Sequence, residues 1–434
     1  MFNTKLKSNW SKSFQLEQIR VFEGCISEMQ EYIGNSSEIT LIGNGRSYSE
    51  NCIARNGMST QFQRRKPILI TKKAVIKTGP YTTISELWKL IAGTNFTLPV
   101  VPGTGFVTVG GAVASDVHGK NHHCDGSIGE HIQSIKLIDG SSNLWELLPE
   151  GETADMFWAT VGGMGLTGVI VEVELKLKGV VSQSLIVKEE RTKGLMDTLE
   201  KLNSVSSTFP YSVAWIDLSS RVNLRGIVSY AYHSDEPSNQ IPFPSERNVF
   251  SVPKVPFNLI RPTSISIFNE AWFRKPLNDK VMNPKLYHHP LDKIGNWNNL
   301  FGRNGPIQYQ FVIPYSSVSY IELFLKRCYE HRFMSPLVVL KNLRKSNNAV
   351  LSFPMEGLTL TVDFARSNEV IQFLRTELDE LIAYGGRIYL AKDELVNTKQ
   401  FRIMYKQLGK FIEIKNQMDP KKKFQSKLSN RLEI

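Results

Sequence analysis

Cysteine is scarce in this chain, with only four among 434 residues and none in CxxC spacing. That scarcity excludes a disulfide-built scaffold and indicates reduced thiols in a cytosolic protein. Long apolar runs are also missing, and the N-terminal stretch MFNTKLKSNWSK has no apolar core of a signal peptide. We therefore expect a cytoplasmic protein that does not span a membrane.

Two common site motifs are missing as well. No GxGxxG with an acidic residue about twenty positions on is present, which disfavours a nicotinamide cofactor. His118, His122 and His123 are close in sequence and suggest a metal site, but no carboxylate or cysteine completes a ligand set at the usual spacing. The expectation is therefore that no metal is bound.

Acidic residues are fewer than basic ones: the chain has 41 Asp and Glu but 52 Lys and Arg, which gives a formal charge of +11. Such a balance admits an anionic partner: nucleic acid, a membrane or an anionic substrate. Residues 246–293 carry a net +4 with interleaved aromatic residues, and 241–300 hold eight of the 20 prolines. This stretch predicts irregular structure. It suits docking on an anionic membrane, and a solvated loop is the alternative.

The most informative segment spans 98–123 and reads LPVVPGTGFVTVGGAVASDVHGKNHH. Glycines cost backbone entropy, and together with the other small residues here they leave little side-chain bulk. A large planar group with the shape of a flavin ring can lie over such a backbone. The alternative interpretation is a tight turn followed by a packed helix of small residues.

Two further glycine clusters strengthen the flavin interpretation. The first, 43–48, follows an apolar run and reads GNGRSY, a turn whose amides suit a pyrophosphate. The second, 158–170, has four glycines and leads into a strand-like alternation over 171–177. Further along, alternation predicts strands over 309–313 and 358–364, and amphipathic spacing predicts helices over 317–331 and 369–384.

Taken together, these motifs resemble the FAD-dependent oxidoreductases of the vanillyl-alcohol oxidase type. The matching stretches are GRSY (45–48), VPGT (101–104), VTVGGA (107–112), DVHGKNHH (116–123), FWATVGGMGLTG (157–168), SVAWID (212–217), YQFVIP (309–314) and GRIYLAKD (386–393). The resemblance implies an α+β fold: a two-lobed FAD-binding domain (1–182), a substrate domain with an antiparallel sheet covered by helices (183–386), and a C-terminal segment (387–434) that returns to the FAD-binding domain.

The resemblance also implies site residues. Noncovalently bound FAD would contact Gly43, Asn44, Gly45, Arg46, Ser47, Tyr48, Gly103, Thr108, Val109, Gly110, Gly111, Ser115, Val117, His118, Gly119, Ile170 and Tyr389. Substrate would contact Lys120, Trp215, Gln308, Gln310, Lys341, Thr361 and Lys392. Lys392, His118 and Tyr48 would be catalytic. Thr361 stands where well-known members have a cysteine, and Ser49 with Glu50 replaces a Gly-Asp pair.

Oxidation of a secondary alcohol needs a path for the hydroxyl proton and an acceptor for the hydride. A lysine beside an apolar flavin has its ammonium pKa lowered by desolvation, which suits Lys392 to proton exchange near neutral pH. Two plainer interpretations stay open. Lys392 can be a surface lysine paired with Asp393, and His118 can be a buried histidine that satisfies a carbonyl.

Within this family the resemblance is to members that act on a lipid-linked sugar. It implies oxidation of the 2-hydroxyl of a polyprenyl-phosphate-linked pentose, such as decaprenylphosphoryl-β-D-ribose, to the 2-keto intermediate. A separate NAD(P)-dependent reductase would complete an epimerisation to the arabinose donor for cell-envelope polysaccharide. The enzyme would be cytoplasmic, with peripheral contact at the inner face of the plasma membrane through residues 246–293.

Three other functions are alternatives to this one. A soluble aldonolactone or sugar-alcohol oxidase can use the same FAD scaffold. A nucleic-acid or membrane binding protein is suggested by charge alone, and the glycine clusters argue against it. A scaffold protein that has lost catalysis is disfavoured because Lys392, His118 and Gln310 are all present.

Overall fold

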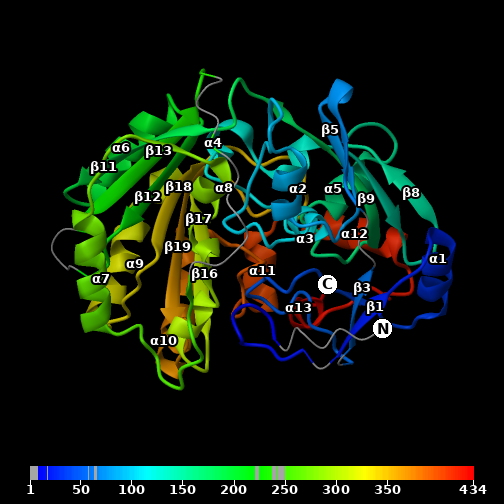
Figure 1. Ribbon diagram of the computed structural model, residues 1–434. Helices are drawn as coiled ribbons and strands as arrows, with labels where there is room; N and C mark the ends of the chain where they lie inside the picture. The colour runs from blue at the N-terminus through cyan, green and yellow to red at the C-terminus, as the bar shows by residue number, and fades with distance from the viewer. Residues whose placement is uncertain are drawn as a thin grey trace.

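The computed structural model describes residues 8–16, 18–56, 58–62, 66–219, 224–236, 241 and 250–434. Two lobes lie side by side in Figure 1, and one cluster of buried apolar side chains contains residues of both. The lobe on the right of Figure 1 contains most of the first 180 residues and the C-terminal helices. The lobe on the left contains the large sheet.

The right-hand lobe is built on two sheets. In the described residues, a parallel sheet has the order β1 (Gln18–Phe22), β3 (Met58–Phe62), β2 (Thr40–Leu41). An antiparallel sheet has the order β4 (Ile68–Ile70), β5 (Val75–Thr78), β9 (Val169–Lys176), β7 (Ile132–Ile138), β8 (Leu144–Leu147). The strand expected over 171–177 is β9.

Helices and short strands complete this lobe: α1 (Ile26–Asn35), α2 (Ile84–Leu90), β6 (Phe96–Thr97), α3 (Val109–Ala114), α4 (His122–Asp125), α5 (Ala154–Thr160) and β10 (Lys178–Gly179). Helix α3 starts inside the segment 98–123. The Thr108 hydroxyl caps it by accepting a hydrogen bond from the Gly111 amide at 3.3 Å. The tight turn and the small-residue helix are therefore both present, and they form a cavity wall, as described below.

The left-hand lobe is organised by one antiparallel sheet. Its order in the described residues is β15 (Lys280–Met282), β11 (Leu185–Thr192), β13 (Gly226–His233), β12 (Tyr211–Ile216), β18 (Val338–Leu343), β19 (Gly357–Ala365), β17 (Pro306–Ile313), β20 (Arg387–Ile388). The helices α6 (Leu195–Ser206), α9 (Ser319–Glu330) and α10 (Asn368–Ala383) accompany it (Figure 1). The predicted antiparallel sheet with helices is therefore confirmed.

The two faces of strand β19 have different surroundings, one facing the helices and the other facing the cavity. Leu358, Leu360, Val362 and Phe364 join the apolar cluster that contains Phe324 of α9 and Leu374 of α10. The alternate residues Thr359, Thr361 and Asp363 point to the opposite face. Thr359 and Asp363 are fully buried despite being polar, so that face is covered by the other lobe.

The proline-rich stretch is more regular than the sequence predicts. Part of it, 242–249, lies outside the described residues, but the remainder contains β14 (Phe250–Ser251), α7 (Pro262–Arg274), α8 (Pro284–His288) and β16 (Ile294–Gly295). The prediction of irregular structure is wrong for α7, a helix of 13 residues. Pro262 occupies the first turn of α7, where a missing amide hydrogen costs nothing.

The C-terminal segment returns to the right-hand lobe. After β20 the chain forms α11 (Thr398–Met404), α12 (Leu408–Met418) and α13 (Lys427–Leu432). Ile39 next to β2 exchanges backbone hydrogen bonds with Lys423 and Gln425 at 2.7 and 3.1 Å. The domain boundaries at 182 and 386 stay predictions. Across the described residues, the helices are too short or too polar to cross a bilayer.

Candidate active site

A cavity of about 630 Å³ lies where the two lobes meet. Its lining combines the turn 43–48, the glycine-rich segment before and within α3, the cavity face of the large sheet, and the loop after β20. The segment 291–297 closes a further side. The predicted residues that line it are Gly43, Asn44, Gly45, Arg46, Ser47, Tyr48, Gly103, Thr108, Gly110, Gly111, Ser115, Val117, His118, Ile170, Gln308, Gln310, Lys341, Thr361, Tyr389 and Lys392.

The turn 43–48 has the properties of an anion site. Within the described chain, the amides of residues 43 to 47 donate no hydrogen bond to protein. Gly45 has φ +59°, a left-handed conformation that favours glycine. The Arg46 guanidinium lies 4.8 Å from the Trp10 ring centroid and 4.7 Å from that of Phe106, and its buried Nε has no partner among the described residues. These features fit the diphosphate of FAD.

The glycine-rich wall leaves space for a planar group. A Cβ built on Gly103 would meet no described atom within 4 Å, although Gly103 lines the cavity. Behind the wall, the Tyr389 hydroxyl donates to the Ser115 carbonyl at 2.8 Å and ties the loop after β20 to the end of α3. The residues present therefore fit a bound flavin.

His118 lies between this wall and the sheet. Gln310 Nε2 donates to His118 Nε2 at 3.0 Å, so this ring nitrogen is the acceptor and the proton lies on Nδ1. Burial, and then the positive charge of Lys341, hold the pKa of His118 well below its ordinary value. His118 is thus a neutral imidazole that contacts Gln310, and it does not satisfy a carbonyl through Nε2.

Lys392 faces the cavity rather than solvent. Its Nζ lies 4.1 Å from the centroid of the Tyr48 ring. Burial lowers the pKa of Lys392 to about 8, and the neighbouring Asp363 carboxylate opposes that shift. Asp363 accepts a hydrogen bond of 2.5 Å from Gln308. The interpretation of Lys392 as a surface lysine paired with Asp393 is therefore wrong.

Strand register explains why the substrate residues meet. Gln310 of β17 is opposite Thr361 of β19, Thr361 is opposite Val339 of β18, and Val339 is opposite Trp215 of β12. Gln308 and Asp363 form the next pair on the same face. Lys341 lies two residues after Val339 and so shares that face too.

Four predicted residues do not line the cavity: Val109, Gly119, Lys120 and Trp215. Val109 is fully buried in the core. Gly119 is packed against Val101 and Asn121. Lys120 donates from Nζ to the Tyr287 carbonyl, and the Trp215 indole donates to the Pro336 carbonyl at 3.0 Å. The three neighbouring histidines do not form a metal site; no group of three or more potential ligands does so in the described residues.

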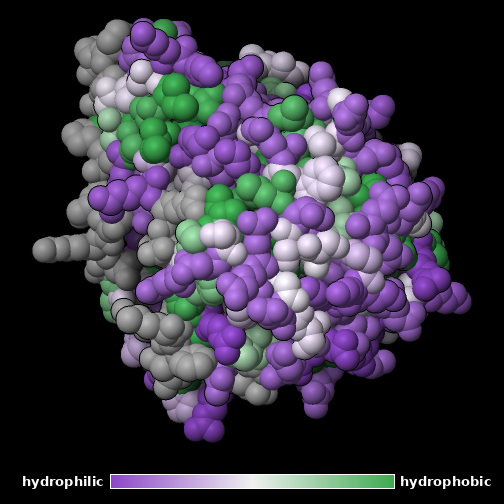
Figure 2. Space-filling model, turned by 90° about the vertical axis from the view of Figure 1, so that its right-hand side faces the viewer, coloured by the Kyte–Doolittle hydropathy of each residue, from purple (hydrophilic) through white to green (hydrophobic). Residues whose placement is uncertain are grey.

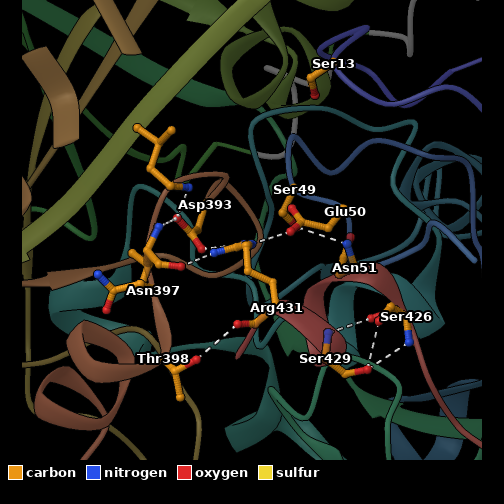
Figure 3. A network of polar contacts seen from close by, with 12 residues as sticks. Ser13, Ser49, Glu50, Asn51, Asp393, Asn397, Thr398, Ser426, Ser429 and Arg431 are labelled. Carbon is orange, nitrogen blue, oxygen red and sulfur yellow. Dashed lines mark hydrogen bonds and ion pairs between the residues drawn. The ribbon is translucent and has the colours of Figure 1, made fainter. Parts of the chain in front are cut away.

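Sequence reasoning missed Asp363 and a polar network behind the site (Figure 3). Arg431 of α13 binds the Glu50 carboxylate through Nε, the Val396 carbonyl through Nη1, and Asp393 Oδ2 through Nη2 at 2.8 Å. Glu50 follows the turn 43–48, and Asp393 follows Lys392. The network therefore joins both functional loops to the C-terminal helix. No local motif signals it, since Arg431 lies more than 30 residues from either partner.

Comparison with family models gives two matches. Residues 26–148 match a family described as FAD binding domain, and residues 362–432 match D-arabinono-1,4-lactone oxidase. The first match contains the turn 43–48 and the wall of α3. The second contains Asp363, Lys392 and Arg431.

Comparison with curated proteins gives a similarity across most of the chain. Decaprenylphosphoryl-beta-D-ribose oxidase of Mycolicibacterium smegmatis is 32% identical over 407 residues, which cover 90% of this chain and 88% of that protein. An uncharacterized protein in the mprA 5′ region of Streptomyces coelicolor is 27% identical over 81% of this chain and 99% of its own length. Human Delta(24)-sterol reductase is 25% identical over 107 residues, a quarter of this chain and 20% of that protein.

Proposed function

This chain belongs to the FAD-dependent oxidoreductases of the vanillyl-alcohol oxidase type, and from that premise we propose that it oxidises the 2-hydroxyl of a polyprenyl-phosphate-linked pentose. The product is the 2-keto sugar, the first half of an epimerisation that supplies an arabinose donor for cell-envelope polysaccharide. The extent of similarity carries the proposal. The relative with that substrate in its name aligns with 90% of this chain, whereas the lactone oxidase family matches only residues 362–432.

Different residues of the chain bind the cofactor and the sugar. The amides and Arg46 of the turn 43–48 hold the diphosphate, and the wall from Gly103 to His118 supports the ring system. FAD bound against that wall would supply the acceptor for the hydride from the sugar carbon. Gln308, Gln310 and Thr361 present polar groups from the sheet, opposite that wall, and orient the sugar hydroxyls.

Lys392 is the group that exchanges the hydroxyl proton. Its pKa, lowered to about 8 by burial, leaves a substantial fraction as neutral amine near neutral pH, and the amine takes the proton as the hydride leaves. Lys392 becomes an ammonium by that transfer, and the nearby Asp363 carboxylate stabilises it. Tyr48 stays a neutral phenol because burial raises its pKa well above the ordinary value, and its ring contacts Lys392.

His118 has a different role from Lys392. Because its Nε2 accepts from Gln310, it cannot take the substrate proton without losing that hydrogen bond. Its Nδ1 hydrogen has no partner among the described residues. His118 therefore serves as the support that fixes Gln310 at the cavity wall.

The test is anaerobic reduction of the enzyme-bound flavin, followed by visible absorbance. A short-chain polyprenylphosphoryl ribose is expected to bleach the flavin in a single turnover, and borodeuteride trapping is expected to place the label at carbon 2. Matched additions of D-arabinono-1,4-lactone and free ribose are expected to leave the flavin oxidised. Bleaching by the lactone but not by the lipid-linked sugar would assign the chain to aldonolactone oxidation.

We extend the proposal to the cofactor linkage and to a partner. FAD is held noncovalently, so acid precipitation of the holoenzyme is expected to release the yellow colour into the supernatant; colour in the pellet would contradict this. The 2-keto product requires hydride return from the opposite face, which falls to a separate NAD(P)-dependent reductase. Adding such a reductase with NADH or NADPH is expected to convert the 2-keto product into the arabino epimer.

A further inference from the structure

The charges that line the cavity do not balance. Of its cationic residues, Arg46 faces the Asp292 carboxylate and Lys392 faces the Asp363 carboxylate. Lys341 is the third cation in the lining, and no ion pair or hydrogen bond of its ammonium is found within the described chain. A buried cation without a counter-ion is costly in a folded protein. Its presence in a ligand cavity points to an anion supplied by the ligand.

Lys341 is surrounded by further positive or neutral groups. It lies on β18, and Lys341 and His118 both line the cavity. Burial, and then the charge of Lys341, lower the pKa of His118, His122 and Lys120. Burial, and then the charge of Lys392, lower the pKa of Lys341 itself to about 8. Lys120 lies behind it, with Nζ bound to the Tyr287 carbonyl and 3.9 Å from the Tyr287 ring centroid. Nothing in this surrounding neutralises the ammonium.

We propose that Lys341 is the binding residue for the phosphate of the substrate. The inference rests on the proposed function and deepens it. In a pentose with a phosphate on carbon 1, that anion is attached beside carbon 2, whose hydroxyl is oxidised. A cation for the phosphate must therefore lie next to the group that takes the hydroxyl proton. Lys341 and Lys392 meet that requirement, since both line the same cavity. A neutral lactone needs no such second cation.

Equilibrium dialysis of the holoenzyme with farnesyl phosphate tests this without turnover, because the probe has no sugar to oxidise. Wild-type enzyme is expected to bind farnesyl phosphate much more tightly than farnesol. Lys341→Met is expected to weaken farnesyl phosphate binding by about tenfold or more, and Lys341→Arg by about threefold or less, because a charge-assisted hydrogen bond is worth more than a neutral one. Lys410→Met, at an exposed lysine of α12 paired with Asp155, is the matched control and is expected to change nothing.

Each remaining outcome decides the question. Equal affinity of wild type and Lys341→Met for farnesyl phosphate would overturn the proposal, as would farnesol binding as tightly as its phosphate. Inorganic phosphate that binds as tightly as farnesyl phosphate would overturn a lipid-linked source for the anion. Lys341-dependent binding in an enzyme that fails to oxidise the polyprenylphosphoryl pentose would support the phosphate site and overturn the sugar assignment alone. Retained flavin and an unchanged melting temperature in both variants show that they are folded.

Discussion

In the proposed reaction, proton transfer depends on two side chains, Lys392 and Asp363. Burial lowers the pKa of Lys392 to about 8, and the Asp363 carboxylate raises it against that effect. The rate of flavin reduction is therefore expected to rise with pH as Lys392 loses its proton near pH 8. Asp363→Asn removes the anion that favours the ammonium, so the rising limb should move to lower pH. The rate of single-turnover flavin reduction, measured across pH in wild type and Asp363→Asn, tests both expectations. A rising limb at the same pH in the two proteins would exclude this role of Asp363.

Substitution of Lys392 itself is a stricter test in the same single-turnover measurement. Lys392→Met leaves no group that titrates at that position, and a loss of about 10² or more in the reduction rate is expected from removal of a proton acceptor. Its flavin content should stay close to that of wild type, because the turn 43–48 and the α3 wall are untouched. A variant that keeps both the rate and the pH limb would place the proton acceptor elsewhere.

A single glycine tests the fit of the flavin wall. Gly103→Val puts a side chain into space that no described atom occupies, and the cost of such overfilling is about 1–3 kcal/mol of FAD binding. The apoprotein should unfold at the wild-type temperature, since nothing in the described fold is displaced. Gly179→Val, also at a position with open space but away from the cavity lining, is the control. Equal FAD affinity in the two variants would contradict the proposed ring position.

Among elements, β17, β19, α9 and α10 could be predicted from alternation and amphipathic spacing alone. Asp363 could not be assigned to the site, because its place in β19 looks like the polar side of any half-exposed strand. Only the pairing with Gln308 shows which surface that side faces. The sequence does not predict helix α7, because prolines within a segment normally disfavour a helix. Pro262 is nevertheless compatible with α7, since it begins the helix.

The C-terminal helix α13 is expected to hold the two functional loops in place. Arg431→Met leaves the buried carboxylates of Glu50 and Asp393 without their shared cation, and breaking a buried ion pair costs about 3–5 kcal/mol. Loss of unfolding free energy of that order is expected in chemical denaturation, together with weaker FAD binding. Arg431→Lys should recover part of both, because it keeps the charge but not the three-way contact. A stable variant with normal FAD affinity would show that the network is dispensable.

In the whole molecule, residues of both lobes line the cavity. The sequence therefore predicts the flavin wall, which is local, but not the residues on the opposite side of the cavity. The glycine clusters predict the wall locally. Gln308, Gln310, Lys341 and Thr361 belong to three different strands, so their meeting depends on the register of the large sheet. The predicted Trp215 lies in the same row as Thr361 and Gln310 but donates to Pro336 outside the cavity lining. The family resemblance, and no local pattern, predicts most of this set.

The surface around α7 differs from the face of the other lobe. Figure 2 shows the latter face as mainly hydrophilic with separate apolar patches. On α7, Ile267 is 72% exposed, and the stacked rings of Phe268 and Trp272 are 48% and 41% exposed. Phe250 and Phe257 in the same stretch are also more than half exposed. This stretch continues along the chain into 291–297, which lines the cavity.

We propose that this surface docks the protein on an anionic bilayer, with residues 250–293 as the described part of the contact. The exposed Lys254 and Arg261, which precede α7, supply the attraction to anionic headgroups. Exchanging Ile267, Phe268 and Trp272 for Asp, Asp and Ala should reduce co-sedimentation with phosphatidylglycerol vesicles by about fivefold or more, because the buried apolar area is lost. Ile68→Asp, at an exposed apolar residue of β4, should leave binding unchanged. If both proteins sediment as wild type does, the α7 surface is a solvated face of the protein and the docking proposal is overturned.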